Sequence, residues 1–225
     1  MPEFIRLSYD IRGGDPGWPG NPKYSYQRHT SIEDGSPANT YRLDLFNHFG
    51  THLDAPNHFN PDGPKIADVP MDRFVYERPL LIETPKGSDE LVMREELERH
   101  ADAIRECDLL LLRSGWQRLR AEDPERYAGE GPGVAPEACE YLIEEFPGLK
   151  AVGMDWISLA AYRRPEEGKL AHQILCGVHH PGRYVIIIED INLSLAPQEM
   201  RRVYAIPLFP EVVDSSPCTV FAESP

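Results

Sequence analysis

The chain has 225 residues, of which 41% are apolar, and this length and composition predict one globular domain spanning residues 1–225. Its 37 acidic residues outnumber its 23 Lys and Arg residues, so the formal net charge is −14. This excess of negative charge argues against a nucleic acid or an anionic membrane as a partner, because binding to either needs a surplus of basic groups.

The cysteines and the start of the chain bear on the cellular location. The four cysteines, Cys107, Cys139, Cys176 and Cys218, show no CxxC spacing, so we expect reduced, mostly buried thiols. The first residues lack a basic segment followed by an apolar one, and the longest apolar run, at 185–188, is too short to cross a bilayer. These features predict a soluble, cytoplasmic protein.

The first half of the chain combines short predicted strands with loops rich in Pro and Gly. Apolar and polar residues alternate at 4–9 and 40–46, which predicts two strands. The Pro- and Gly-rich region 12–38 between them is expected to form ordered loops. Within it, Trp18 lies between Gly and Pro, where a tryptophan either packs on the surface or points into a pocket. A short apolar segment at 80–83 predicts a further strand.

Strands and helices alternate in the second half of the chain. Strands are predicted at 108–113, 150–154 and 184–189. The first is apolar at successive positions, which is typical of a strand buried on both faces, and the last is rich in β-branched residues. Helices are predicted at 93–105 and 135–146, the second with Pro136 in its first turn. The alternation predicts a mixed α/β domain.

Three of the eight histidines fall within 11 residues, at His48, His52 and His58, together with Asp54. Imidazole and carboxylate groups are ligands that suit Zn²⁺, Mn²⁺ or Fe²⁺. In a fully extended chain His48 and His52 would lie about 13 Å apart, too far to share one cation. The chain must therefore bend or form a helical turn between them, and Gly50 supplies the backbone freedom for a bend. The cluster predicts a metal centre.

The other histidines outside this cluster give weaker indications. His100 is expected on the solvated face of the predicted helix 93–105, and His29 has no partner in the sequence. His179 and His180 lie in a loop, where a place at the rim of a pocket and plain exposure to solvent both remain open.

The run from His48 to Phe59 has the pattern HxGTHxDxPxH, and it resembles the signature of the metal-dependent cyclase family, which includes bacterial kynurenine formamidase (arylformamidase) and isatin hydrolases. Weaker similarity covers most of the chain, at Trp18–Pro22, Leu112–Trp116, Val152–Asp155, Ser158, His172, Gly177, Glu189, Asn192–Leu193 and Asp214–Pro217. The stretch 179–183 is an insertion relative to the formamidases.

The resemblance implies a swivelling β/β/α fold with a mixed sheet, a homodimer or homotetramer, and one or two Zn²⁺ ions or a Mn²⁺ ion. It also implies hydrolysis of a small aryl formamide, amide or lactam, with a place in tryptophan catabolism for a kynurenine formamidase. The implied ligands are His48, His52 and Asp54 for a first cation, and His172 and Glu189 for a second, with Asp54 near enough to bridge. The implied general acid/base is His58.

The residue types account for such a reaction. A divalent cation lowers the pKa of water from about 15.7 towards 7 and so makes hydroxide available at neutral pH. His58 can take the proton of that water and return it to the leaving nitrogen, because a histidine side chain exchanges protons near neutrality. Trp18, Phe46 and Trp116 are candidates for holding an aromatic substrate, although Phe46 fits ordinary core packing equally well.

Two other functions use the same residues. His52, Asp54 and His172 could form the 2-His-1-carboxylate site of a non-haem Fe²⁺ oxygenase, with Arg183 holding a 2-oxo acid. That scheme leaves His48 and His58 without a role and requires an all-β fold. The third possibility is a metal-binding protein without turnover, whose site would be closed by four protein ligands.

Overall fold

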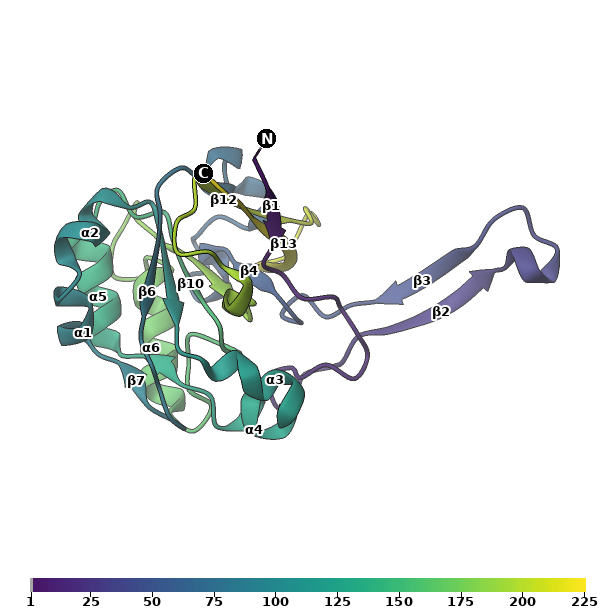
Figure 1. Cartoon of the computed structure of the whole chain (residues 1–225), viewed down its shortest axis with the longest axis horizontal. Helices are drawn as coiled ribbons and strands as arrows, with labels where there is room; N and C mark the ends of the chain where they lie inside the picture. The colour runs from purple at the N-terminus through teal and green to yellow at the C-terminus, as the bar shows by residue number, and fades with distance from the viewer. Residues whose placement is uncertain (1) are drawn as a thin grey trace.

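The computed structural model describes residues 2–225, and a mixed sheet of nine strands forms its centre (Figure 1). Its strands are β1 (Phe4–Arg6), β4 (His52–Asp54), β5 (Val75–Tyr76), β6 (Pro79–Glu83), β8 (Leu109–Arg113), β10 (Ala151–Met154), β11 (Ile186–Glu189), β12 (Arg202–Pro207) and β13 (Ser215–Glu223). They are ordered β5-β12-β13-β4-β11-β10-β8-β6, and β1 pairs with β13. The four strands β6, β8, β10 and β11 run parallel, and the remaining pairings are antiparallel.

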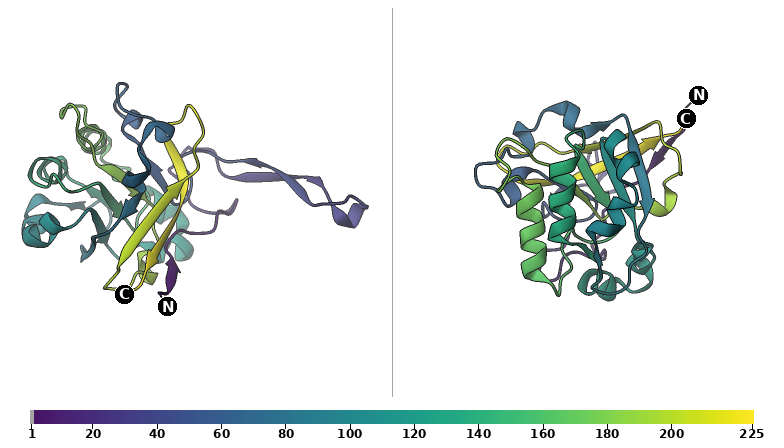
Figure 2. Two further views of the ribbon diagram at one scale, coloured as in Figure 1. Left: turned by 90° about the horizontal axis from the view of Figure 1, so that it is seen from above. Right: turned by 90° about the vertical axis from the view of Figure 1, so that its left-hand side faces the viewer.

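Helices cover one face of the parallel strands. They are α1 (Arg94–Glu98), α2 (Ala101–Glu106), α5 (Pro136–Glu145) and α6 (Pro165–Leu175), while α3 (Leu119–Glu122) and α4 (Pro124–Gly129) lie at one end of the sheet (Figure 1). Helices α5 and α6 pack side by side on this face, and α1 and α2 lie next to α5 (Figures 1 and 2). A small parallel pair, β7 (Leu91–Val92) and β9 (Gly133–Val134), lies at the edge of this layer.

Successive side chains of the parallel strands enter two different cores. In β8, Leu110 and Leu112 pack with the helices, whereas Leu109 and Leu111 pack in a second core. That second core also contains side chains of β12 and β13, so the antiparallel strands curve over the face opposite the helices. Burial on both faces is what the apolar run 108–113 predicts, and the mixed α/β fold is confirmed.

Strands β2 (Ser25–Thr30) and β3 (Thr40–Asp44) form a hairpin that projects from the body (Figures 1 and 2). The strand expected at 40–46 is present as β3, whereas the expectation that region 12–38 forms only loops is wrong, because this region contains β2, the partner of β3. The tyrosines at alternate positions 24 and 26 carry the strand signal. Turn-forming residues on both sides outnumber these tyrosines, and for this reason the composition of the region predicts loops and no strand.

The other predicted elements agree with the structure at most positions. Strands β6, β8, β10 and β11 and helix α5 lie where they are expected. The helix expected at 93–105 is divided into α1 and α2, because His100 has φ −115° and ψ 12°, outside the helical region. Helix α6 is absent from the predictions, although Pro165 followed by Glu166 and Glu167 is a typical helix start.

The remaining sequence-based expectations concern cysteines and membrane segments. The four cysteines are free and buried, as predicted. Among residues 2–225, no helix combines the length and the apolar character needed to cross a membrane.

Helix α6 approaches the segment after β10 closely enough to require glycine. A Cβ atom at Gly168 would lie 2.2 Å from Cβ of Ala160. We expect Gly168→Ala to destabilise the fold by about 1–3 kcal/mol, because α6 must move away. Gly129 in α4 has open space around its Cβ position, so Gly129→Ala is the matched control and should change stability by about 1 kcal/mol or less. Urea unfolding of both variants measures the difference, and equal stabilities would contradict the prediction.

Candidate active site

The short central strand β4 places two polar side chains on one face of the sheet. Side chains alternate along a strand, so Leu53 enters the second core while His52 and Asp54 point to the opposite face. In the antiparallel pairing of β4 with β11, Glu189 lies directly opposite His52 and therefore shares its face. His52 Nε2 is 3.2 Å from Glu189 Oε2. The register thus brings together side chains that are 137 positions apart in the sequence.

His48 reaches the same place through a turn, not a helix. Gly50 has φ +68°, in the left-handed region that favours glycine, and the chain bends there before β4 begins. His48 Nδ1 lies 3.1 Å from Asp54 Oδ1, and the rings of His48 and His52 are 5.3 Å apart. The bend predicted from the spacing of the two histidines is therefore present.

Two imidazoles are oriented by backbone carbonyls. His52 Nδ1 lies 2.8 Å from the carbonyl oxygen of Gly50, and His172 Nδ1 lies 2.7 Å from that of Gly168, one turn earlier in α6. A carbonyl oxygen can only accept a hydrogen bond, so Nδ1 carries the proton in both rings. In the neutral, cation-binding form of each ring the lone pair then lies on Nε2, which faces Glu189. Metal-binding histidines are commonly held in this way.

The carboxylate of Asp54 is buried among imidazole nitrogens, of which His48 Nδ1 lies nearest, 3.1 Å from Oδ1, but none of them forms a well-aligned hydrogen bond with it. Its side chain is 0% exposed, and neither oxygen has a hydrogen-bond partner among the described residues, nor has His52 Nε2. Burial alone raises the pKa of Asp54, but the surrounding charges of His58, His48 and His52 lower it well below its usual range. A buried charge without hydrogen bonds is costly, and a bound cation removes that cost.

Glu189 is held by the segment that follows β10. Its Oε1 accepts hydrogen bonds from Ser158 Oγ (3.0 Å) and from the backbone N–H of Leu159 (2.7 Å). Burial and the charge of Asp54 raise the pKa of Glu189, but His172 and His52 outweigh them and lower it to about 2. Glu189 is therefore an ionised carboxylate whose Oε2 remains directed at His52.

His58 is paired with a second carboxylate. It lies in the 3₁₀ turn Pro56–His58, and its Nδ1 is 2.6 Å from Asp214 Oδ2. The same oxygen lies 3.2 Å from His48 Nε2. Burial raises the pKa of Asp214, but the hydrogen bonds to His48 and His58 outweigh it and keep the carboxyl ionised. His58 Nε2 points towards Asp54, at 3.9 Å.

These side chains form two overlapping groups with metal-ligand geometry. One contains His52, Asp54 and Glu189, and the other contains His48, Asp54 and His58. In each group one possible ligand atom per residue lies within 4.8 Å of the others. The donor set and the unpaired buried atoms fit a divalent cation. The grouping differs from the division implied by resemblance, because His52 pairs with Glu189 and His48 pairs with His58.

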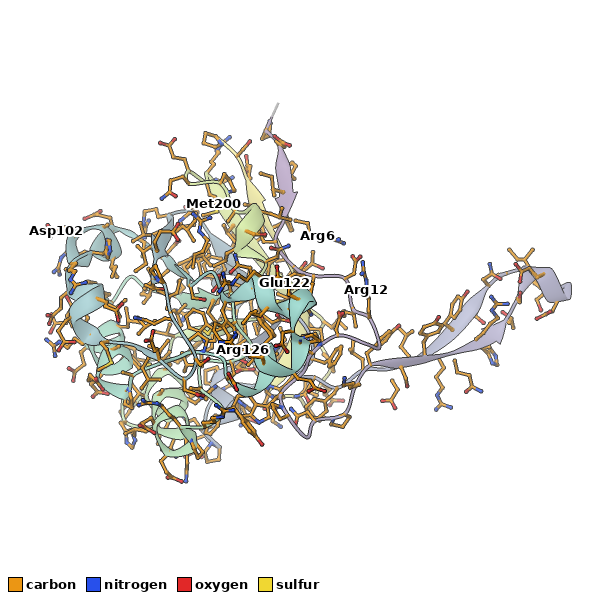
Figure 3. All side chains as sticks on the ribbon, turned by 60° about the horizontal axis from the view of Figure 1, so that its bottom comes forward. Arg6, Arg12, Asp102, Glu122, Arg126 and Met200 are labelled. Atoms are coloured by element: carbon orange, nitrogen blue, oxygen red, sulfur yellow. The ribbon has the colours of Figure 1, made fainter. Side chains whose placement is uncertain are left out.

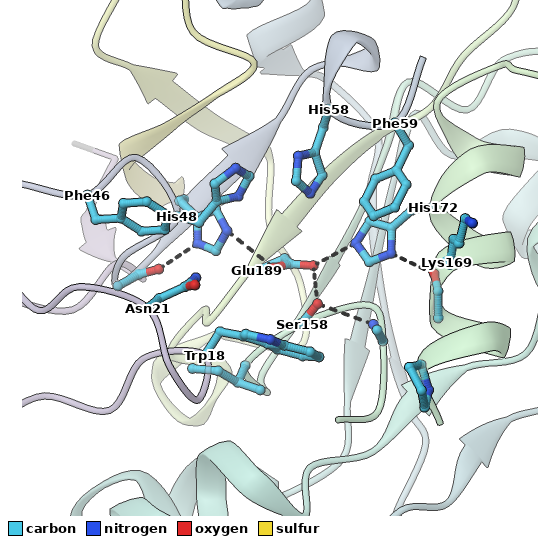
Figure 4. Close-up of a pocket in the computed structure, with 16 residues that line it drawn as sticks. Trp18, Asn21, Phe46, His48, His58, Phe59, Ser158, Lys169, His172 and Glu189 are labelled. Atoms are coloured by element: carbon cyan, nitrogen blue, oxygen red, sulfur yellow. Dashed lines mark hydrogen bonds and ion pairs between the residues drawn. The ribbon is translucent and has the colours of Figure 1, made fainter. Parts of the chain in front are cut away.

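The cluster opens into a cavity of ≈ 440 Å³ (Figure 4). Its apolar lining residues are Trp18, Phe46, Phe59, Ile157, Ala160 and Pro165. Figure 4 shows Glu189 in the middle of the cavity, with His58 and His172 on one side and Trp18 on the other. A cavity of this size with apolar walls and a few polar groups is typical of a site for a small molecule.

Two of the three predicted substrate-binding aromatics line this cavity, and one does not. Trp18 and Phe46 are part of its wall. Trp116 is instead buried in the core beneath the helices, where its Nε1–H donates to the carbonyl of Tyr127. The left-handed turn at Gly115 (φ +80°) directs it inward. The expectation that Trp116 grips the substrate is therefore not supported by its position.

The histidines at positions 29, 100, 179 and 180 and Arg183 lie outside the cluster. His29 and His100 are exposed, and His180 Nε2 lies 3.1 Å from Glu140 Oε1. Neither His179 nor His180 lines the 440 Å³ cavity. Arg183, which an oxygenase would need at its substrate, donates instead to the carbonyl of Phe146 and lies outside this cavity.

Three residues of the site have no role in the sequence-based predictions. Asp214 and Ser158 belong to the segments that resemble the cyclase family, but the sequence alone assigns them no chemical role. Phe59, next to His58, stacks on His172 with ring centroids 4.6 Å apart. The signal for Asp214 and Ser158 is their place in those segments. Only the folded chain reveals their partners, because each contact joins distant residues.

Comparison with known proteins places this chain in a family. Residues 5–161 match the Cyclase family, described as putative cyclase. Because this match covers more than half of the chain, the protein belongs to the Cyclase family, as the motifs predicted. The match includes His48 to His58 and Ser158, and it ends before His172 and Glu189.

Individual relatives match most of the chain. A kynurenine formamidase of Paracidovorax citrulli is 28% identical over 223 residues, which are 97% of this chain and 95% of that protein. An uncharacterized protein of Haemophilus influenzae is 36% identical over 127 residues, or 56% of this chain and 89% of that protein. Isatin hydrolase A from Labrenzia aggregata has the same fold, with a TM-score of 0.85 and 21% identity, covering 99% of this chain and 94% of that chain.

Removing the negative charge of Asp54 should abolish the increase in thermal stability that a bound divalent cation gives the protein. With Zn²⁺ or Mn²⁺ at 100 times its dissociation constant, we expect stabilisation by about 2.7 kcal/mol, which raises Tm by roughly 5–10 °C. Asp54→Asn should show little of this shift, because the shared carboxylate is lost. Asp62→Asn, at an exposed position in the following loop, should retain it. Thermal unfolding with and without metal tests this, and an equal shift in Asp54→Asn would contradict it.

Proposed function

We propose that this protein is a metal-dependent hydrolase that cleaves the C–N bond of a small aromatic amide, either an aryl formamide or a lactam. The observation that carries the proposal is the buried carboxylate of Asp54, which has no well-aligned hydrogen bond among the described residues and lies among histidines at the end of an apolar cavity. The relatives named kynurenine formamidase and isatin hydrolase support an amide or lactam as the substrate.

The cation would be held by residues of β4, β11 and the adjoining segments. His52, Asp54 and Glu189 would form the core of the site, with His48 beside Asp54 and His172 beside Glu189. Zn²⁺ and Mn²⁺ both suit this mixture of imidazole and carboxylate groups, in one or two sites. When bound, such a cation supplies Lewis acidity, which polarises a carbonyl group and makes water more acidic.

His58 would move the proton. Asp214 accepts the hydrogen bond of His58 Nδ1–H, so the lone pair on Nε2 is directed towards the site. His58 can therefore take a proton from water as its oxygen bonds to the amide carbon. When the C–N bond breaks, His58 returns this proton to the leaving nitrogen. A formamide then gives an amine and formic acid, and a lactam gives one opened product that carries both the amine and the carboxylic acid. Asp214 holds the ring in the correct orientation and balances its positive charge.

The walls of the cavity would hold an aromatic ring. Trp18 packs edge-on against Tyr162 with ring centroids 5.3 Å apart, and Phe59 is fixed by stacking on His172. Phe46 closes the wall next to His48. Aromatic side chains present flat apolar surface with few rotatable bonds, so they bind a planar substrate at low entropic cost. N-formylkynurenine, from tryptophan catabolism, and isatin are the first candidates.

The two other functions considered from the sequence are less well supported. An oxygenase would need Arg183 near His52 and Asp54, whereas Arg183 contacts Phe146, and the fold is mixed α/β. A closed structural metal site would not need an adjoining cavity or the paired His58 and Asp214. Turnover under strictly anaerobic conditions excludes the oxygenase.

The decisive variant is His58→Ala. Absorbance assays of N-formylkynurenine and isatin with Zn²⁺ or Mn²⁺ should show hydrolysis by the wild type. We expect His58→Ala to lower kcat by about 10²–10⁴ and to retain its metal content, because the proton carrier is lost and the ligands remain. Asp214→Asn should lower kcat by about 10–100-fold.

His100→Ala is the matched control, since it removes an exposed imidazole away from the cavity, and it should leave kcat unchanged. Loss of metal from His58→Ala would show that His58 is a ligand. If the metal-loaded wild type hydrolyses no formamide, lactam or ester, the hydrolase proposal is wrong.

We further propose that the protein assembles as a homodimer or homotetramer through the hairpin β2–β3. Directly paired residues share a face, and the pairs Tyr26↔Leu43 and Arg28↔Tyr41 give the hairpin one face rich in apolar groups. Tyr26 is 64% exposed, Leu43 59% and Tyr41 47%. Figure 3 shows the side chains of the hairpin standing clear of the body. An isolated two-stranded hairpin is marginally stable, so this face needs a partner surface.

Charge favours a second copy of the chain as that partner. Residues 23–44 contain three basic groups (Lys23, Arg28, Arg42) and three acidic groups (Glu33, Asp34, Asp44). The formal charge of −14 therefore resides entirely on the rest of the molecule. Two copies repel each other least where the hairpin is the contact surface.

The double variant Tyr26→Ser/Leu43→Ser tests this assembly. We expect the wild type to form a dimer or tetramer and the double variant to be monomeric, because the apolar contact area is lost. Ser25→Ala/Gln27→Ala alters the opposite, polar face of the hairpin and is the control. Light scattering after gel filtration measures the molar mass, and a monomeric wild type would overturn the proposal.

A further inference from the structure

Arg120 is a buried arginine for which the chemistry above has no use. It lies in α3, and its side chain is 9% exposed. Its Nε donates to both carboxylate oxygens of Asp190, at 2.9 Å and 3.1 Å, and its Nη2 donates to Asp190 Oδ2 at 2.9 Å. The guanidinium also lies 3.9 Å from the ring centroid of Tyr9. A paired, planar contact of this kind is directional as well as attractive.

Asp190 has a backbone conformation that requires such support. Its φ is +53°, a left-handed value that is uncommon for a residue with a side chain. Its carboxylate is fully buried, and the hydroxyl of Tyr127 donates to Oδ1 at 2.6 Å. A conformation of this kind persists where several neighbours fix it at once. Asp190 directly follows Glu189, so its left-handed conformation lies at the point where β11 ends.

The same residue is connected to the other strand of the metal centre. The carbonyl of Asp190 accepts a hydrogen bond from Thr51 Oγ1 at 2.6 Å, and Thr51 immediately precedes His52. The backbone N–H of Asp190 donates to the carbonyl of Trp156 at 3.0 Å. Asp190 therefore connects the ends of the strands that carry Glu189 and His52.

Arg120 also contacts the loop that forms part of the cavity wall. Its Nη2 donates to Asp15 Oδ2 at 3.4 Å. Asp15 is half-buried and lies three residues before Trp18, which lines the cavity. Arg120 itself is absent from the lining of that cavity as formed by the described residues.

We infer that Arg120 is a positioning residue that couples the metal centre to the wall of the substrate cavity. Through Asp190 it fixes Glu189 and, by way of Thr51, His52; through Asp15 it fixes the loop of Trp18. The inference rests on the proposed function for the roles of Glu189, His52 and Trp18. Its contact with Asp190 controls metal binding, and its contact with Asp15 controls substrate binding.

The positioning role of Arg120 can be tested by measuring metal affinity, which does not depend on whether the protein turns over a substrate. In the full-length protein, Arg120→Met should weaken Zn²⁺ and Mn²⁺ binding by about 10–100-fold, measured by competition with a chelator, as is typical when the support of a ligand is removed. Tyr127→Phe removes the hydroxyl that donates to Asp190, and it should also weaken metal binding, but by a smaller factor than Arg120→Met. Asp15→Asn should leave metal affinity unchanged and raise KM for N-formylkynurenine about threefold or more without changing kcat.

Arg73→Met is the matched control. Arg73 also stacks on a tyrosine, Tyr184, at 4.5 Å, and its guanidinium donates to the carbonyls of Lys150 and Tyr184. These contacts lie at the start of β11, at the opposite end from Glu189. Arg73→Met should lower stability and leave metal affinity unchanged.

The outcomes distinguish this inference from the proposed function. Wild-type metal affinity in a folded Arg120→Met protein, as judged by circular dichroism, overturns the inference even where hydrolysis occurs as proposed. Weaker binding in Arg120→Met supports it even where the wild type hydrolyses no amide. If Arg120→Met does not fold, Tyr127→Phe decides, and wild-type affinity in that variant overturns the inference.

Discussion

The three-residue strand β4 is the constraint from which the arrangement of the site follows. It lies between β11 and β13, so its backbone is hydrogen-bonded on both sides and its register cannot slip without moving Leu53 out of the second core. With Leu53 fixed in that core, His52 and Asp54 must face the other way. The pairing then places Glu189 opposite His52 and Ser215 opposite Asp54, which brings the neighbouring Asp214 to the edge of the cluster.

The polar atoms of the cluster divide into those that contact the protein scaffold and those that face inward. His52 Nδ1, His172 Nδ1 and Glu189 Oε1 are all hydrogen-bonded to the surrounding backbone or to Ser158. Three inward atoms, His52 Nε2 and both oxygens of Asp54, lack well-aligned hydrogen bonds among the described residues. Ligands held by their outer atoms undergo little rearrangement when a cation binds, and this preorganisation favours tight binding.

The residues of this site come from segments that lie far apart in the sequence. The histidine-rich segment supplies Asp54 and three imidazoles, and it lies inside the region that matches the Cyclase family. His172 and Glu189 follow beyond residue 161, and Asp214 follows later still. The kynurenine formamidase relative covers all of these segments, in agreement with a site that is built from the whole chain.

Much of the fold and the centre of the site could be predicted from local patterns. The apolar run 108–113 and the β-branched run 184–189 predicted buried strands because burial on both faces leaves a continuous apolar signal. The spacing of His48 and His52 around Gly50 predicted a bend, since no extended chain could bring them together. The hairpin strand β2 and helix α6 were missed, because neighbouring Pro, Gly and charged residues masked their weaker periodic signals.

The sequence by itself determined the kinds of ligand available, the bend that gathers the nearby ones, and the family to which the chain belongs. Tertiary structure alone decided that Glu189 faces His52, that Asp214 orients His58, that Trp116 lies in the core, and that Arg120 reaches Asp190. The physical reason is that spacing along the chain limits only nearby contacts. Contacts between distant residues depend on strand register and on which face of an element is buried, and both are set by the packing of the whole chain.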